Sequence, residues 1–162
     1  MTTFTTRRRV PHSPAQMYDL VADVERYPEF LPLCEGLKVR RRETVVGLDV
    51  LVADMTVGYK AIRETFTSRV TLKPAEHRIE VAYIDGPFRF LDNRWQFHPL
   101  PDGGTDVEFF IAYEFKSPML GLLVGGLFDA AFRKFTSAFE ARARAVYGTR
   151  ATGGSPLPSP ST

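Results

Sequence analysis

Six consecutive segments in which apolar and polar residues alternate, joined only by short turns, constrain this chain more than any other feature. Alternation with a period of two is typical of strands that bury one face. Connections such as Asp85-Gly86-Pro87 and Pro101-Asp102-Gly103-Gly104 are too short for parallel crossovers, so the sequence predicts an antiparallel meander. The predicted strands cover residues 36–45, 47–57, 60–72, 77–85, 88–99 and 104–116.

A further strand and two short helical segments precede the meander. Residues 1–10 alternate weakly and predict the first strand. Ser13-Pro14 is a typical helix start, and the apolar residues that follow keep helical spacing, so we expect a short helix over residues 14–22. Pro28 and Pro32 interrupt the next stretch, which predicts at most a broken second helix and a loop.

The last predicted element is a long helix that begins near Ser117-Pro118. An apolar stripe with helical spacing continues from there over about 28 residues. Residues 118–128 carry no charge and are apolar on every side of the helix, so this helix start is either wholly buried or in contact with another apolar surface. Gly121, Gly125 and Gly126 each cost about 1 kcal/mol relative to alanine, which indicates close backbone approach or local looseness.

Seven antiparallel strands with one apolar face need a cover, and only the C-terminal helix is large enough to provide it. With 162 residues, the chain is long enough for one domain. We therefore expect an α+β fold over residues 1–148, with a curved seven-stranded antiparallel sheet wrapped around the long C-terminal helix. Residues 149–162 are mainly Gly, Pro, Ser and Thr, which predicts a disordered tail.

Charge and cysteine content narrow the classes of partner. Arg7-Arg8-Arg9 and Arg40-Arg41-Arg42 lie in predicted strands and either protect sheet edges from aggregation or attract anionic lipid or RNA. A formal net charge of only +2 argues against a dedicated nucleic-acid binder, and we expect no DNA partner. The lone Cys34 and an N-terminus without an apolar stretch predict a cytoplasmic protein.

Residue patterns for covalent or metal catalysis are not visible. His12, His77 and His98 are scattered without metal-ligand spacing, so we expect no metal and no catalytic residue of this kind. Glu64 is the most interesting polar residue, because it shares a predicted inward face with Phe66. It either meets water or an arginine near the mouth of the sheet, or it anchors a ligand headgroup or acts as a general acid.

The aromatic residues, 13 Phe, 6 Tyr and 1 Trp, either fill a solid core or line a hollow. One helix across a strongly curved sheet leaves a hollow, and an apolar hollow with a few polar groups is the usual form of a ligand site. Trp95, with Leu91 and Phe97 on its strand face, either packs in the core or lines such a pocket. The inward residues that we expect at the pocket are Glu64, Phe66, Trp95, Phe97, Phe109, Ile111, Tyr113, Leu123, Leu127, Phe128 and Phe132.

Tyr27-Pro28-Glu29-Phe30-Leu31-Pro32-Leu33-Cys34 resembles the Y-x-x-F-L-P-x-C signature of the coenzyme Q-binding branch of START-like (polyketide cyclase/dehydrase) proteins. The segments Phe66-Thr67-Ser68-Arg69-Val70 and Gly86-Pro87-Phe88, the stretch from Leu91 to Phe97 and the helix from Ser117 to Ala143 are similar to that family too. The resemblance covers about residues 3–147. It implies a helix-grip fold with a deep apolar cavity, and it places Phe30, Leu31, Pro32 and Trp95 around that cavity.

The resemblance implies two functions. Some relatives bind a polyisoprenoid quinone for the respiratory chain, and some bacterial members are described as ribosome-association toxins that block subunit joining. We therefore expect non-enzymatic binding of a hydrophobic ligand, ubiquinone or a related prenyl lipid, by a chaperone or carrier that needs no cofactor and contacts the inner face of the membrane peripherally. The alternative is a ribosome-binding protein that uses Arg40, Arg41 and Arg42, and a second alternative is a cyclase-like enzyme that uses Glu64.

Overall fold

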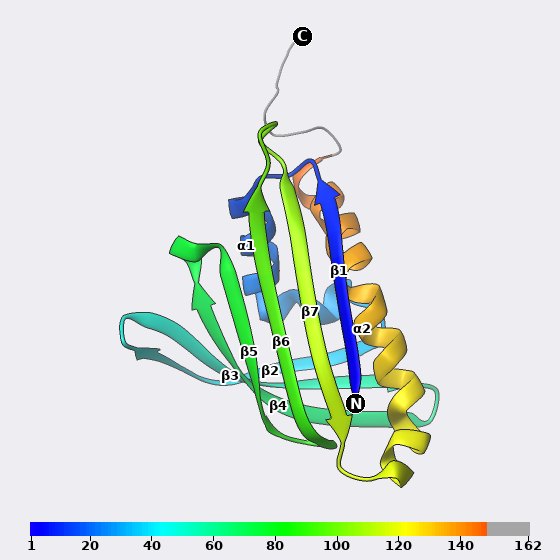
Figure 1. Cartoon of the computed structure of the whole chain (residues 1–162). Helices are drawn as coiled ribbons and strands as arrows, with labels where there is room; N and C mark the ends of the chain where they lie inside the picture. Colours follow the sequence, from blue (N-terminus) through cyan, green and yellow to red (C-terminus); the bar gives the residue numbers. More distant parts are fainter. Residues whose placement is uncertain (149–162) are drawn as a thin grey trace.

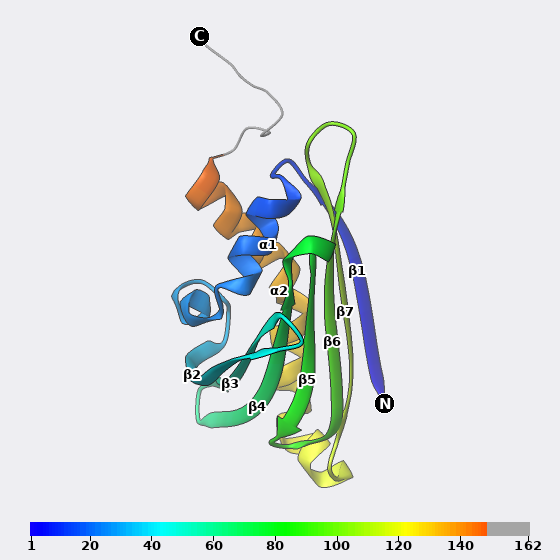
Figure 2. The same cartoon turned by 90° about the vertical axis from the view of Figure 1, so that its left-hand side faces the viewer.

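A curved antiparallel sheet holds a long helix on its concave side in the computed structural model, which describes residues 1–148 (Figures 1 and 2). This is the predicted fold, and the predicted strands and helices lie close to the observed ones. The predicted tail, residues 149–162, lies outside the described residues. The elements in chain order are β1 (Thr2–Val10), α1 (Pro14–Ala22), the 3-10 helix η1 (Val24–Glu29), β2 (Cys34–Val45), β3 (Leu48–Tyr59), β4 (Ile62–Lys73), the 3-10 helix η2 (Pro74–Glu76), β5 (Arg78–Asp85), β6 (Phe88–Pro99), β7 (Thr105–Phe115) and α2 (Pro118–Tyr147).

The strand order of the sheet is β1-β7-β6-β5-β4-β3-β2. Strands β2 to β7 form the predicted meander, whereas β1 pairs with the last strand, with Thr2 opposite Tyr113 and Val10 opposite Thr105. The two edges of the sheet are therefore β1 and β2. These are the two strands that carry the arginine triplets.

Strong curvature makes the sheet wrap around α2, with β2 to β4 crossing the direction of β6 and β7 at a steep angle (Figure 1). Register shifts accompany the bend, one between Val39 and Arg41 in β2 and one at Ile84 in β5, which lies between the partners of Thr67 and Ser68. Such bulges increase the local twist of a strand. Gly86 permits the tight approach of the β5–β6 turn, because its φ is +144° and a Cβ there would lie 2.6 Å from the Cβ of Phe66.

Both helix starts follow the predicted chemistry. The backbone N–H of Gln16 donates to the Ser13 hydroxyl at 3.1 Å, and the Ser13 N–H donates to the Gln16 side chain at 3.0 Å. This reciprocal arrangement is a capping box, followed by proline at the first helical position. At the start of α2, the Ser117 hydroxyl accepts from the Leu120 N–H at 3.2 Å.

The glycines of α2 allowed two interpretations in the sequence, and the structure does not require close backbone approach. A Cβ at Gly121 or Gly125 would lie 3.6 Å from the ring of Phe115, which is an ordinary van der Waals distance. A Cβ at Gly126 would meet nothing within 4 Å. These distances do not support close backbone approach, and they agree with local looseness of the helix start.

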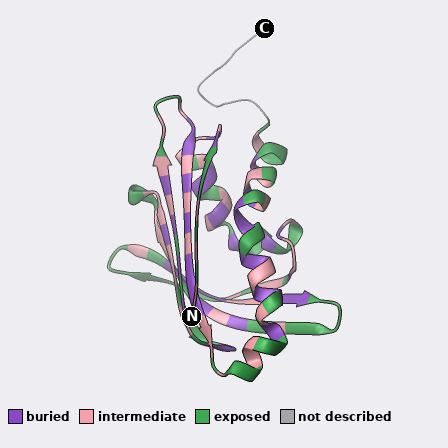
Figure 3. Ribbon diagram, turned by 45° about the vertical axis from the view of Figure 1, so that its right-hand side comes forward, coloured by how far each residue is buried: buried purple, intermediate pink, exposed green. Residues whose placement is uncertain are grey.

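The core lies between the concave face of the sheet and the inner face of α2 (Figure 3). Five phenylalanines are almost completely removed from solvent, and burying each stabilises the fold by about 1.5–3 kcal/mol. The fully buried phenylalanines are Phe88, Phe97, Phe109, Phe128 and Phe139.

Within residues 1–148, no helix is long and apolar enough to cross a bilayer.

Candidate functional site

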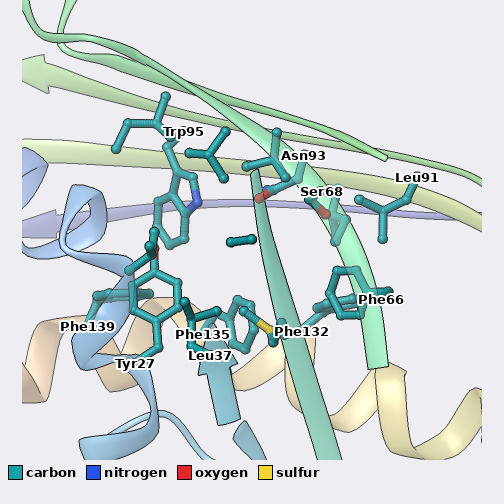
Figure 4. Close-up of a pocket in the computed structure, with 17 residues that line it drawn as sticks. Tyr27, Leu37, Phe66, Ser68, Leu91, Asn93, Trp95, Phe132, Phe135 and Phe139 are labelled. Atoms are coloured by element: carbon teal, nitrogen blue, oxygen red, sulfur yellow. The ribbon is translucent and has the colours of Figure 1, made fainter. Parts of the chain in front are cut away.

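An apolar cavity lies between the sheet and α2, with walls from η1, from strands β2 to β7 and from the middle of α2 (Figure 4). The space open to the centre of a water-sized sphere is about 60 Å³. That volume holds a few water molecules, since one needs about 10–15 Å³ by this measure. The hollow expected from the sequence is therefore present but narrow, and a larger occupant must displace side chains.

Trp95 is the centre of the aromatic wall. Its ring lies 4.6 Å from that of Phe109, 6.1 Å from that of Phe97 and 5.2 Å from that of Phe139, measured between ring centroids. Phe66 in β4 reaches across to α2, where its ring lies 6.5 Å from that of Phe132 in an edge-to-face arrangement. Such contacts stabilise the packing beyond the area that they bury.

The Y-x-x-F-L-P-x-C segment fixes η1 against α2. Tyr27 and Phe30 both place their rings edge-on to Phe139, at 5.3 and 5.1 Å. The hydroxyl of Tyr27 donates to the carbonyl of Val21, and burial raises the pKa of this phenol well above its ordinary value. Tyr27 also lines the cavity, so the segment contributes directly to the candidate site.

Few polar groups line the cavity, and none of the described residues along its wall is charged. Asn93 in β6 donates from its side-chain amide to the carbonyl of Phe110 at 2.9 Å. Ser68 in β4 is buried, and its hydroxyl has no hydrogen-bond partner among the described residues. Figure 4 shows Ser68 and Asn93 on the same side of the cavity as Trp95, facing Phe132 and Phe135.

Four of the residues expected at the pocket line this cavity: Phe66, Trp95, Ile111 and Phe132. Another group packs in the filled core beside it. Phe30 flanks the cavity, with its ring 5.1 Å from Phe139 and 5.0 Å from the Arg142 guanidinium. The residues in the filled core are Leu31, Phe97, Phe109, Tyr113, Leu127 and Phe128.

Three other expected residues lie away from the cavity. Leu123 is 61% exposed, because it lies on the outer side of α2, whereas the next residue, Val124, is buried. Glu64 pairs with Val57 near the β3–β4 turn and is only half-buried, so it does not face the hollow. Pro32 is half-buried in the loop between η1 and β2.

Several cavity residues were not among those expected. Ser68 and Asn93 each lie two residues from a residue that was, Phe66 and Trp95, so strand alternation already placed them on the inner face. The α2 stripe likewise continues to Phe135 and Phe139. The remaining lining residues outside the expected set are Val24, Tyr27, Leu37, Ala53, Met55, Val70, Ile79, Val81 and Leu91.

The arginines of the β2 triplet contact acidic residues of the same chain. Arg40 lies 2.7 Å from Asp54 and Arg42 lies 2.7 Å from Glu25, measured from nitrogen to oxygen. Arg41 lies 3.7 Å from Glu43. All three side chains stay more than half exposed, and such pairs contribute about 0–1 kcal/mol each.

The β1 triplet makes similar contacts at the opposite edge. Arg7 lies 2.6 Å from Asp106, and Arg8 lies 2.6 Å from Glu140 of α2. The hydrogen bond from Arg7 holds the pKa of the Asp106 carboxyl below its ordinary value. Charged side chains on both edge strands agree with protection of the sheet from edge-to-edge pairing.

Groups suited to nucleophilic or metal chemistry are not assembled in the described part of the chain. Burial raises the pKa of the Cys34 thiol to about 11, which keeps it protonated at neutral pH. Residues 1–148 contain no cluster of three or more His, Cys, Asp or Glu side chains that could hold a metal ion.

Known proteins are similar to this chain in sequence or in fold. The chain is 38% identical over 139 residues to the ribosome association toxin RatA of Vibrio cholerae, covering 86% of this chain and 93% of that protein. It is 33% identical over 137 residues to the mitochondrial coenzyme Q-binding protein COQ10 homolog B of Xenopus laevis, covering 82% of this chain and 54% of that protein. A START superfamily protein from Mycobacterium smegmatis has the same fold, with a TM-score of 0.73, 23% identity and coverage of 89% and 98%.

A family model described as polyketide cyclase/dehydrase and lipid transport matches residues 10–140, which contain every element from α1 to β7 and most of α2. The description of this family covers cyclases as well as lipid transport. The match over residues 10–140 shows that this chain, which has the START-like fold, belongs to the polyketide cyclase/dehydrase and lipid transport family.

Proposed function

We propose that this protein binds a prenyl lipid, ubiquinone or a close relative, and carries it without changing it chemically. The observation that supports this most directly is the uncharged, aromatic cavity between the sheet and α2. Burying each CH₂ of an isoprenoid chain contributes about 0.8 kcal/mol, so such a wall binds the chain without hydrogen bonds. The similarity to the frog protein named for coenzyme Q binding favours the same ligand class.

Entry of the ligand requires movement, because the cavity is narrow without an occupant. The start of α2 is the element best suited to move, since its three glycines weaken the helix. Side chains of the cavity wall on β2 and β3, such as Leu37 and Met55, are only partly buried and adapt to the chain that enters. We expect α2 to shift away from the sheet during loading.

The same end of α2 supports a peripheral contact with a membrane. Met119, Leu122 and Leu123 are 64%, 84% and 61% exposed, so the helix presents apolar side chains to solvent. Lys116 lies beside this turn and adds positive charge, which attracts anionic lipid headgroups, whereas the neighbouring Arg89 is paired with Glu114 at 2.9 Å. A carrier at the inner face of the cytoplasmic membrane would exchange its ligand through this surface.

Lipid extraction from the purified protein, followed by mass spectrometry, tests the proposal. The expected result is a co-purified prenyl lipid, with stabilisation of the delipidated protein by added ubiquinone. Ala53→Leu, which fills the cavity wall, is expected to lose both signals, and Ala82→Leu on the exposed outer face is the matched control. Repeated absence of any prenyl lipid, together with no stabilisation, would contradict the proposal.

Ribosome binding is the second candidate, favoured by the similarity to the Vibrio cholerae protein named as a ribosome association toxin. The exposed arginines Arg40, Arg41 and Arg42 on the edge strand β2 would contact RNA phosphates. This function predicts co-sedimentation with ribosomes that is lost when all three become Glu. The same charge change at Arg7, Arg8 and Arg9 is the control. Equal co-sedimentation of the two variants with ribosomes would show that the β2 arginines are not the ribosome-binding surface.

A cyclase-like activity through Glu64 has less support, because this side chain lies outside the cavity wall. Turnover of a candidate substrate that is unchanged in Glu64→Gln would exclude Glu64 as an acid or base.

A further inference from the structure

A buried hydroxyl without a partner stands out in an otherwise apolar cavity. Ser68 is 6% exposed, and its Oγ makes no hydrogen bond to the described residues. The other buried polar atoms without a partner in residues 1–148, on His12, Tyr18 and Asp106, are not part of the cavity wall. Buried polar groups almost always have a partner, so an unpaired one that faces a hollow indicates an absent ligand.

The backbone holds Ser68 at this place. It is the first β4 residue after the register shift in the pairing with β5, where Thr67 lies opposite Asp85 and Ser68 lies opposite Tyr83. Asn93 lies two strands away in β6, and its amide is fixed by the hydrogen bond to Phe110. Both side chains project from the concave face toward the aromatic rings of α2 (Figure 4). The sheet side of the cavity therefore carries two polar groups among apolar side chains, whereas the helix side carries hydrocarbon alone.

We infer that Ser68 and Asn93 bind a neutral oxygen at the head of the ligand, a carbonyl or hydroxyl, while the aromatic wall holds the hydrocarbon. The Ser68 hydroxyl donates to this oxygen, and the Asn93 amide provides the neighbouring polar surface. This inference rests on the proposed function and adds the orientation of the ligand to it. The head lies deep against the sheet, and the chain extends along α2.

The same wall discriminates between kinds of headgroup. None of the described residues along the cavity is charged, so a carboxylate or phosphate there would be buried without a counter-charge. A quinone carbonyl or a prenol hydroxyl needs only the hydrogen bond that Ser68 offers. The site therefore accepts neutral prenyl quinones and alcohols and rejects fatty acids and phospholipids.

Calorimetric titration of wild-type protein and Ser68→Ala tests the inference, with three probes: a short-chain ubiquinone, an isoprenoid hydrocarbon of similar length without oxygen, and the corresponding prenyl carboxylate. Ser68→Ala is expected to weaken ubiquinone binding about tenfold and to leave hydrocarbon binding unchanged. The carboxylate is expected to bind the wild type more weakly than ubiquinone. Ser137→Ala, at an exposed serine of α2, is the matched control.

A second measurement separates ligand binding from a structural role. Without ligand, Ser68→Ala is expected to be at least as stable to urea as the wild type, because the change removes an unpaired buried hydroxyl. Equal weakening of ubiquinone and hydrocarbon, a loss of stability, or unchanged ubiquinone affinity would each overturn the inference while leaving the lipid-binding function in place. If neither ubiquinone nor the hydrocarbon binds the wild type, the proposed function itself fails.

Discussion

Trp95 and Phe139 meet edge to face, with ring centroids 5.2 Å apart, and this contact joins β6 to α2 at the cavity. Phe139 also receives the rings of Tyr27 and Phe30, so one position of the helix connects the sheet with η1. A ligand that separates α2 from the sheet must change the surroundings of Trp95. Because the chain has a single tryptophan, tryptophan emission reports the surroundings of Trp95.

Bound ubiquinone is expected to quench the Trp95 emission in a saturable manner, since the indole lines the space that the ligand fills. A fluorescence titration measures the dissociation constant directly. Ala53→Leu, with its cavity filled, should show only weak quenching that rises linearly with concentration. Linear quenching of the wild type as well would mean random collision in place of binding.

Gly126→Ala is expected to stabilise the protein by about 0.5–1 kcal/mol, because alanine is the better helix former and its Cβ meets nothing within 4 Å. Urea denaturation measures the difference. Gly86→Ala is the contrasting variant and should destabilise the fold, since its φ of +144° and the nearby Phe66 leave no room. A loss of stability at Gly126 would contradict the open surroundings of this position.

The Cys34 thiol is expected to react slowly with thiol reagents at pH 8, because burial raises its pKa to about 11. In the unfolded chain the thiol ionises near pH 8.5, so it contributes stability below that pH and loses it as pH rises toward 11. The loss should appear in urea denaturation between pH 8 and 10 and be smaller in Cys34→Ala. Labelling at equal rates in folded and unfolded protein would show that the thiol is accessible.

Asp106 is expected to contribute to acid stability, because the hydrogen bond from Arg7 lowers the pKa of its carboxyl. A depressed pKa stabilises the fold above the unfolded value of about 3.9, and this contribution is lost as pH falls through the folded pKa. Acid titration followed by circular dichroism should therefore show a weaker pH dependence below pH 4 in Asp106→Asn. Asp92→Asn, which removes one negative charge from the exposed face of β6, is the matched control for the change of charge.

Leu122→Asp is expected to weaken binding to anionic vesicles about tenfold or more, because it removes an apolar side chain that would insert and adds a repelled charge. Vesicle sedimentation measures the change. Val46→Asp makes the same kind of substitution at the β2–β3 turn, where the side chain is 95% exposed, and should have little effect. Equal losses in both variants would indicate an effect of net charge alone.

The elements of the fold could be predicted because their signals are local. Period-two alternation marked each strand, and the serine–proline pairs Ser13-Pro14 and Ser117-Pro118 marked both helix starts. The pairing of β1 with β7 had no such signal, because it joins distant parts of the chain. Alternation predicts which face of the sheet a side chain occupies, but it does not predict which strand lies beside it.

The cavity was harder to predict for the same reason. Phe66 and Phe97 both face inward, yet Phe66 lines the hollow, whereas Phe97 packs against α1, with its ring centroid 6.0 Å from that of Tyr18. Leu123 follows the helical stripe, but it lies on the outer side of α2, next to the buried Val124. Ser68 was not expected at the pocket, although alternation with Phe66 placed it on the inner face, because the cavity wall was predicted mainly from bulky side chains.

Strand β1 opens the chain and pairs with β7, which is the last strand to be made. During synthesis β1 therefore stays unpaired until β7 has been made. Pairing of strands so far apart in the sequence closes a long loop, which slows folding. The three arginines of β1 disfavour association of this unpaired strand with other nascent chains. A shortened product that stops before Thr105 would carry this strand with nothing to pair it.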